Sequence, residues 1–273
     1  MNDTDLNIGF VGGGNMTRAV IAGLLNAGHD PERIAVADPL EPQRARILEL
    51  NAAISTCADN GDVAELAELL VLAVKPQILP VVADELRTAR NDKGFIVSIA
   101  AGVKLGRLQD WFGAGVPIVR MMPNQPALVG AGMSVLIAND VCTKQHRYDA
   151  EYLATSVGKS AWIKDESLMD AVTAISGSGP AYFYLLMEIM SSCARDMGLS
   201  DELARLLTRQ TALGAGLSAQ LSEQSVNDLR ASVTSPGGTT AAAIEVLENG
   251  GIRETVTAAL NAAHKRSREL GAD

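Results

Sequence analysis

Hydrophobic and polar positions follow two different patterns in the two parts of this 273-residue chain. From residue 6 to about residue 163, short apolar runs rich in Val and Ile alternate with segments whose apolar residues recur at helical spacing. The runs are LNIGFV, RIAVAD, LLVLAVKP, GFIVSIAAG, PIVRMMPN, MSVLIAN and SAWIKD, and the helical segments between the earlier runs include 16–27, 41–51 and 78–90. This alternation predicts an α/β fold, a doubly wound and mostly parallel sheet with helices on both faces.

From about residue 168 no further strand-like run occurs, and the apolar residues recur only at helical spacing. The expected helices are 180–197, 201–221, 225–233, 240–249 and 252–270. We therefore expect two domains, residues 1–163 with the sheet and residues 164–273 with helices alone.

The segment 180–197, PAYFYLLMEIMSSCARDM, is apolar around much of its circumference. A helix of this kind is expected to be buried on several sides. Association with a second copy of the chain would bury it, and so would a central position in a monomeric helical bundle. Both alternatives stay open.

Composition excludes several classes of protein. The chain is 47% hydrophobic and 4% aromatic, and its formal net charge of −9 opposes nucleic-acid binding, which needs a basic surface. No apolar stretch reaches the ~18 residues of a membrane span, and the acidic start MNDTDL is unlike a signal peptide. Cys57, Cys142 and Cys193 are widely spaced, which favours reduced thiols and no metal site. We expect a cytoplasmic protein with no membrane segment.

A glycine-rich turn joins the first strand to the first helix in IGFVGGGNMTRAV. Gly12 and Gly14 occupy positions at which glycine lets the backbone approach a pyrophosphate at a helix N-terminus, whereas Thr17 departs from the third glycine of the fingerprint. Asp38 ends the second strand-like run, roughly 20 residues further on, where an acid reads an adenosine ribose. The first domain is therefore predicted to be a Rossmann-like dinucleotide-binding domain.

The choice between the two nicotinamide cofactors stays open. Asp38 would accept hydrogen bonds from a ribose and repel a 2′-phosphate, which favours NADH. Arg44 and Arg46 on the next helix could meet a 2′-phosphate, which favours NADPH, or they could form a solvated helix face.

Three strand-like runs end in small or polar residues at the carboxyl edge of the predicted sheet, where open α/β sheets bind ligands. Lys75 ends AVKP, and the next two runs end in SIAAG and MMPNQP. These ends are suited to a crevice for a nicotinamide ring. The alternative is that they are ordinary surface loops, which are commonly rich in small and polar residues.

The usual general acids and bases are scarce. His29, His146 and His264 are interpreted as surface residues, so the site has to depend on positioning. Near the C-terminus, SPGGTT (235–240) places two glycines and three hydroxyls at the start of a helix. Such a turn is suited to a small carboxylate, and the alternative is a simple N-cap between two helices.

Two further stretches lie near the domain junction. SGSGP (176–180) is interpreted first as a tight helix crossing and second as part of the site. Glu166 begins the helical part, and its place at the junction makes it a candidate, although an acid in a first helical turn is favoured by the helix dipole alone.

The segments IGFVGGGNM, LAVKPQ, SIAAGV, RMMPNQPALVGAGM, SGSGPAY and SPGGTT, in this order, resemble the pyrroline-5-carboxylate reductase family. The resemblance implies a Rossmann domain followed by a helical domain that forms a homodimer by interleaving helices, with dimers assembled into rings such as a decamer. It implies reduction of 1-pyrroline-5-carboxylate to proline by NADPH, with NADH as a possible alternative. It also implies an active site between the Rossmann domain of one subunit and the helical domain of its partner.

The resemblance also implies the roles of single residues. The expected catalytic residues are Thr240, Ser235 and Lys75. The expected substrate-binding residues are Glu166, Ser235, Gly238, Thr239 and Thr240. The expected cofactor-binding residues are Gly12, Gly13, Gly14, Asn15, Met16, Asp38, Asn60, Ala73, Val74, Lys75, Ala100, Ala101, Pro123 and Asn124. Asp38 and Ser232 depart from residues that relatives carry, Ser or Thr and Asn respectively.

Two other functions remain open from the sequence. A β-hydroxyacid dehydrogenase also joins a Rossmann domain to a helical one, but it uses a lysine in the helical part, where Lys265 is the only lysine beyond Glu166. A non-enzymatic nucleotide-binding regulator is the second alternative.

Overall fold

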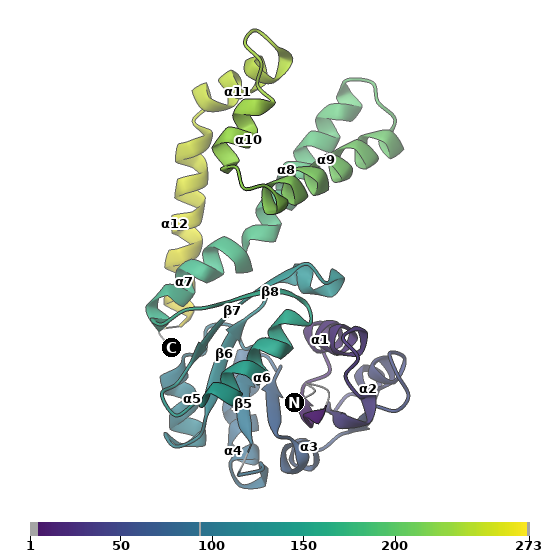
Figure 1. The fold of residues 1–273 in the computed structure, drawn as a ribbon, viewed down its shortest axis with the longest axis vertical. Coiled ribbons are helices and arrows are strands. Elements are labelled where there is room, and N and C mark those ends of the chain that lie inside the picture. The colour runs from purple at the N-terminus through teal and green to yellow at the C-terminus, as the bar shows by residue number, and fades with distance from the viewer. Residues whose placement is uncertain (1–4, 93, 272–273) are drawn as a thin grey trace. The chain divides into compact units, whose positions relative to one another are not determined.

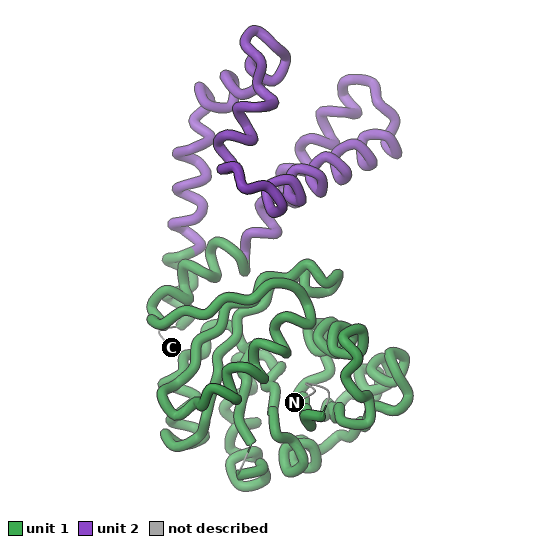
Figure 2. Tube along the Cα trace, in the orientation of Figure 1, with its two compact units in different colours: residues 1–177, 264–273 green, residues 178–263 purple. Residues whose placement is uncertain are grey.

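A computed structural model describes residues 5–92 and 94–271 of the chain. The chain separates into two compact units, residues 1–177 with 264–273 and residues 178–263, which are coloured green and purple in Figure 2. The expected domain boundary at residue 163 lies inside the first unit.

An eight-stranded sheet forms the centre of the first unit (Figure 1). Its strands are β1 (Ile8–Val11), β2 (Ile34–Ala37), β3 (Ser55–Cys57), β4 (Leu69–Leu72), β5 (Phe95–Ser98), β6 (Ile118–Met122), β7 (Gly132–Ala138) and β8 (Gly158–Trp162). The spatial order is β3-β2-β1-β4-β5-β6-β7-β8, and every pair is parallel except β6 with β7. The first six strands have the order of a dinucleotide-binding sheet, and the strand order reverses between β1 and β4. The predicted fold class is confirmed.

The strand β3 was not among the predicted runs. It has three residues, Ser55, Thr56 and Cys57, which are exposed or half-buried at the edge of the sheet. A short edge strand of this kind carries no apolar run, so hydrophobic patterning gives no signal for it.

Two hydrophobic clusters cover the two faces of the sheet. One contains buried residues of α1 (Asn15–Asn26), α2 (Glu41–Leu48) and α6 (Lys144–Thr155), and the other contains those of α3 (Asn60–Leu66), α4 (Leu79–Ala89) and α5 (Leu105–Phe112). In β4 the side chains alternate between them, because Leu69 and Val71 pack in the first cluster and Leu70 and Leu72 in the second. Burial on both faces explains why β1 and β4 carry no polar side chain.

The second unit is entirely helical in its described residues. A short helix, α7 (Met169–Val172), and one π turn lead to α8 (Gly179–Asp196), α9 (Asp201–Leu221), α10 (Val226–Ser232), α11 (Thr239–Asn249) and α12 (Ile252–Leu270). Each of the five predicted helices is found within one residue of its expected bounds. The last turns of α12 belong to the first unit, where Ser267 Oγ donates to Asp170 Oδ1 at 2.7 Å. Among the described helices, none is both long enough and apolar enough to cross a membrane.

Helix α8 is not buried within the single chain. Phe183 is 65% exposed, and Leu185, Leu186 and Ile189 are exposed by half or more. The central position in a monomeric bundle, one of the two alternatives from the sequence, is therefore wrong.

Candidate functional site

The glycine-rich turn after β1 passes close to the end of β4. Gly12 has φ of +102°, and a Cβ atom at this residue would lie 2.7 Å from the carbonyl oxygen of Ala73. Both facts exclude a side chain at Gly12. The Thr17 hydroxyl donates to the Gly12 carbonyl at 2.6 Å and is buried, so Thr17 fixes the turn from the position where the fingerprint has its third glycine.

The N-terminus of α1 lacks a side-chain cap. Gly14 is the N-cap residue, and the first backbone bond of the helix runs from Arg18 N–H to the Gly14 carbonyl at 3.1 Å. The N–H groups of the first helical turn therefore have no acceptor within the helix. Nothing lies within 4 Å of a Cβ atom built on Gly14, so the backbone is open to a ligand there. These groups suit a pyrophosphate.

Asp38 is 9% exposed and holds two loops together. Its Oδ2 accepts a hydrogen bond from Gly13 N–H at 2.8 Å, and its Oδ1 accepts one from Leu40 N–H at 2.9 Å. The carboxylate thus fixes the glycine-rich turn against the turn after β2. It retains further lone pairs, so binding of a ribose stays a prediction for this residue.

Two arginines surround the same turn. Arg18 Nη1 donates to Gln43 Oε1 at 2.9 Å, and its Nη2 donates to Asn15 Oδ1. Arg44 Nη1 donates to the backbone carbonyl of Asp38 at 2.7 Å. Within the described residues, neither Arg18 nor Arg44 forms a salt bridge with a carboxylate.

The other expected cofactor residues lie at the carboxyl edge of the sheet. Ala73 N–H donates to the Val11 carbonyl at 2.9 Å, which brings the ends of β1 and β4 together beside the glycine-rich turn. Met16 and Val74 are half-buried there, Ala100 and Pro123 are buried, and Lys75 and Ala101 are exposed. Their cofactor contacts stay predictions.

Two expected cofactor residues have partners within the protein. Asn60 Nδ2 donates to Glu85 Oε2 at 3.0 Å. Asn124 accepts from Met133 N–H at 2.9 Å and donates to the Ser176 carbonyl at 3.0 Å. Asn124 therefore fixes the SGSGP segment to the end of β6, a structural role that the sequence did not reveal.

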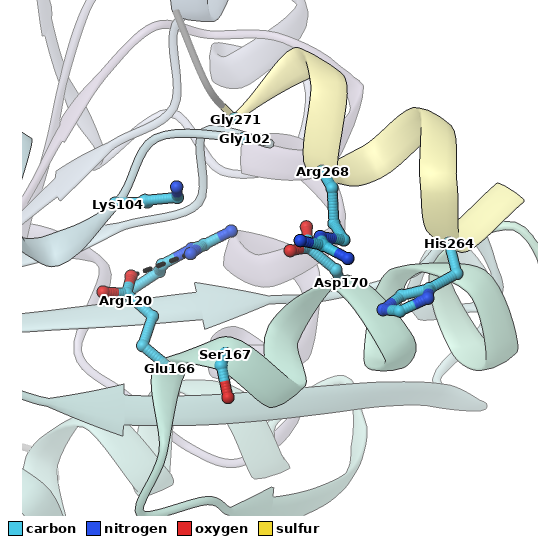
Figure 3. Close-up of a pocket in the computed structure, with 9 residues that line it drawn as sticks. All are labelled: Gly102, Lys104, Arg120, Glu166, Ser167, Asp170, His264, Arg268 and Gly271. Carbon is cyan, nitrogen blue, oxygen red and sulfur yellow. Dashed lines mark hydrogen bonds and ion pairs between the residues drawn. The ribbon is translucent and has the colours of Figure 1, made fainter.

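Glu166 lies in a cavity of about 480 Å³ in the first unit (Figure 3). Its Oε1 accepts hydrogen bonds from Arg120 Nη1 and from Leu105 N–H, both at 2.8 Å. The Arg120 side chain is only 6% exposed, so this ion pair is largely removed from water. Glu166 thus caps α5 and neutralises Arg120, and its expected contact with the substrate stays a prediction. In this cavity the Glu166 carboxylate already neutralises Arg120. The first N–H groups of α1, beside the glycine-rich turn, have no acceptor within the helix.

The SPGGTT turn begins α11 in the second unit. Gly237 has φ of +70°, and Gly238 N–H donates to the Ser235 carbonyl at 3.0 Å, which closes the turn. Gly238 is the N-cap residue, no side chain caps the helix, and the first helical bond is that of Ala242 N–H with the Gly238 carbonyl. A simple cap between two helices was the alternative interpretation; the N-cap residue is Gly238, and none of the three hydroxyls makes a capping hydrogen bond.

The hydroxyls of this turn are available to a ligand. Ser235 and Thr239 are exposed, and Thr240 is half-buried. The neighbouring hydroxyls of Ser232 and Thr234 donate instead to backbone carbonyls of α10, at 2.8 and 2.6 Å. The turn combines free backbone N–H groups with three hydroxyls, which is the donor set that a carboxylate requires.

The structure reveals three site residues that the sequence did not. Thr17 fixes the Gly12 carbonyl, Arg18 joins Asn15 to Gln43, and Arg120 is neutralised by Glu166. Thr17 carried a signal, because it replaces the expected third glycine. Arg120 stands within a buried strand, where a charged residue requires a partner.

The strand order, the turn after β1 and the uncapped N-terminus of α1 define a dinucleotide-binding protein of the Rossmann class. The model of NADP oxidoreductase, coenzyme F420-dependent, matches residues 7–102, and that of pyrroline-5-carboxylate reductase dimerisation matches residues 166–270. The chain belongs to the pyrroline-5-carboxylate reductase family.

Relatives support this membership over nearly the whole chain. The pyrroline-5-carboxylate reductase of Pseudomonas aeruginosa is 44% identical over 96% of both chains, and that of Pisum sativum is 39% identical over 96% of this chain and 95% of its own. A solved reductase from Coxiella burnetii is 42% identical and has a TM-score of 0.92. The match covers 97% of this chain and 98% of that one. The Plasmodium falciparum enzyme, solved with NADP bound, is 31% identical and has a TM-score of 0.87. The match covers 98% of this chain and 99% of that one.

Proposed function

We propose that this chain reduces 1-pyrroline-5-carboxylate to L-proline, the final step of proline biosynthesis. Relatives at 39–44% identity over almost the full length carry this name. The observation within the molecule that carries the proposal is the SPGGTT turn. Its hydroxyls form no capping hydrogen bond, and the first N–H groups of α11 have no side-chain acceptor. The two alternatives from the sequence lack such support, because the relatives named above are pyrroline-5-carboxylate reductases.

The substrate is a small cyclic imine with one carboxylate. Backbone N–H groups at the start of α11, with the hydroxyls of Ser235 and Thr239, would hold that carboxylate. Gly238 would let the backbone approach it, because no side chain stands there. The Thr240 hydroxyl would then face the ring nitrogen.

A nicotinamide cofactor supplies the hydride when it is bound. With the imine nitrogen already protonated, hydride addition at C5 would pass the π electrons of the C=N bond to nitrogen and leave a neutral secondary amine with one N–H bond. A protonated imine accepts hydride readily, so the protein mainly has to align the two reactants. The Thr240 hydroxyl can support the nitrogen proton, so this step does not require a histidine.

The cofactor is held by the first unit in this proposal. The free N–H groups at the start of α1 and the bare backbone of Gly14 fit a pyrophosphate, as the geometry at these residues indicates. We propose NADPH as the main cofactor, with NADH accepted less well. An NADP-bound relative supports this choice.

We also propose that the chain forms a homodimer and that dimers assemble into a larger ring, such as a decamer. The match to a dimerisation model over residues 166–270 supports self-association, and so do the exposed apolar residues of α8. The cytoplasmic location stays a prediction.

Substitution of Thr240 by valine tests the proposed site. Valine keeps the shape and removes the hydroxyl, so we expect kcat/KM for 1-pyrroline-5-carboxylate to fall about 10- to 100-fold. Ser235→Ala is expected to raise KM more than it lowers kcat, because that hydroxyl would hold the carboxylate in ground state and transition state alike. Steady-state kinetics of NADPH oxidation measures both.

Thr88→Val provides a matched control, because Thr88 is an exposed residue of α4 outside the proposed site. Its kinetics should equal those of the unmodified protein. Unchanged kcat and KM in Thr240→Val would contradict the role of the turn.

A further inference from the structure

We propose that Arg44 is the residue that binds the 2′-phosphate of NADPH and thereby sets cofactor preference, an inference that rests on the proposed function. The sequence left Arg44 and Arg46 equivalent, as two arginines on one helix. The structure separates them, because Arg44 is half-buried against the turn after β2 and Arg46 is exposed.

Arg44 is held in place by the end of the strand that carries the ribose-reading position. One of its five guanidinium N–H groups donates to the Asp38 carbonyl at 2.7 Å. Since no carboxylate pairs with Arg44 among the described residues, the other donors of its planar fork are available to a phosphate. Holding the guanidinium before the ligand arrives reduces the entropy lost on binding.

The Asp38 carboxylate is engaged with main-chain N–H groups. Both oxygens already accept main-chain N–H groups, from Gly13 and Leu40, and the residue is 9% exposed. An acid at this position commonly reads the ribose hydroxyls and repels a 2′-phosphate. Here the two amide dipoles stabilise its charge, and Arg44 adds a positive charge beside it.

The glycine-rich turn lies against the same groups. A Cβ atom on Gly13 would lie 3.4 Å from Asp38 Cβ and 3.5 Å from Gln43 Cβ, so the second glycine packs directly on the start of α2. Arg18 reaches Gln43 from α1 and closes the other side. A dinucleotide whose pyrophosphate lies at the start of α1 would place its adenosine ribose beside this turn, within the region that Arg44 borders.

Binding of NADP⁺ and NAD⁺ to the full chain, measured by titration calorimetry without substrate, tests the inference. We expect the unmodified protein to bind NADP⁺ more tightly than NAD⁺. Arg44→Ala should weaken NADP⁺ about 10- to 100-fold and change NAD⁺ by less than about twofold. Arg46→Ala removes the same charge from the same helix and should leave both affinities unchanged.

Arg44→Lys provides a second, more conservative variant in case Arg44→Ala does not fold. It keeps the charge and loses the fork, so NADP⁺ affinity should fall by less than in Arg44→Ala, again with NAD⁺ unaffected. Tighter binding of NAD⁺ by the unmodified protein, equal losses for both cofactors, an effect of Arg46→Ala matching that of Arg44→Ala, or an Arg44→Lys indistinguishable from the unmodified protein would each overturn the inference. The binding measurement contains no substrate, so it tests the inference separately from the proposed function. If Arg44→Ala lost affinity for NADP⁺ alone while the unmodified protein did not reduce 1-pyrroline-5-carboxylate, only the proposed function would be overturned.

Discussion

At the scale of single residues, acidic side chains in this protein organise backbone N–H groups. Asp38 accepts two of them, and Glu166 accepts one together with the guanidinium of Arg120. Each acid joins segments that are distant in sequence, Asp38 to the glycine-rich turn and Glu166 to the start of α5. Such contacts fix the loops of the candidate site.

Removal of Glu166 should destabilise the protein, because it leaves Arg120 buried and unpaired. We expect Glu166→Ala to lower the free energy of unfolding by about 2 to 3 kcal/mol, less than for a fully buried pair because the Glu166 side chain is 25% exposed. Urea denaturation measures the change. Glu65→Ala, at an exposed acid of α3, should change it by less than about 0.5 kcal/mol.

A structural role for Glu166 has a clear contrary result. If Glu166→Ala unfolds at the same urea concentration as the unmodified protein, the ion pair contributes nothing. A large increase in KM for the substrate in a protein of unchanged stability would instead support the substrate contact expected from the sequence.

The geometry of the candidate site could be predicted from sequence where it depends on residues close together in the chain. Gly12 and Gly14 stand between a strand and a helix, and SPGGTT carries more hydroxyls than one cap requires. The partners of Asp38 and Glu166 were not predictable, because Gly13 lies 25 residues from Asp38 and Arg120 lies 46 residues from Glu166. Only the folded backbone brings these groups together.

At the scale of elements, α6 depends on a histidine in its first turn. Thr143 Oγ1 accepts from His146 N–H, and His146 Nδ1 accepts from Thr143 N–H, both at 3.2 Å. The imidazole also stacks on Phe95 of β5, with ring centroids 4.9 Å apart. This capping box requires a neutral imidazole, because a protonated Nδ1 cannot accept.

The pH dependence of stability should reflect this requirement. Burial lowers the pKa of His146 in the fold below its ordinary value near 6.5, against the opposing effect of the Asp149 carboxylate. The contribution of neutral His146 is therefore complete above that ordinary value and is lost as the pH falls below it. We expect the urea midpoint to decrease between about pH 7 and about pH 5.

His146→Gln should reduce this decrease, because the glutamine oxygen can accept from Thr143 without titrating in that range. His264→Gln is the control for loss of an imidazole elsewhere. An identical decrease in His146→Gln and the unmodified protein would show that another group is responsible.

Most elements could be predicted because their apolar patterns are long. The helices 201–221 and 252–270 have the bounds expected from periodicity. The three-residue strand β3 could not be predicted, since its pairing with β2 depends on backbone bonds at the edge of a sheet. The assignment of the last turns of α12 to the first unit could not be predicted either, because it depends on contacts such as that of Ser267 with Asp170.

At the scale of the whole molecule, the apolar face of α8 has to be covered. Neighbouring exposed apolar side chains on one helix are typical of an interaction site. The family model of dimerisation matches the same region, so a second copy of the chain is the expected partner.

Phe183→Asp tests the expected assembly. Phe183 is 65% exposed in the single chain, so the substitution should leave the fold intact and place a charge in the interface. We expect the unmodified protein to sediment as a dimer or a larger ring and Phe183→Asp to sediment mainly as a monomer with reduced activity. Leu66→Asp, at a 69% exposed residue of α3, should retain the native assembly. A monomeric unmodified protein would contradict the proposed assembly.

The most direct test of the proposed function is to incubate the purified full-length protein with 1-pyrroline-5-carboxylate and NADPH and to measure NADPH consumption and L-proline together. We predict one L-proline formed for each NADPH oxidised, and no comparable reduction of NADP⁺ with a 3-hydroxy acid. Consumption of neither reactant, or turnover of the 3-hydroxy acid instead, would contradict the account.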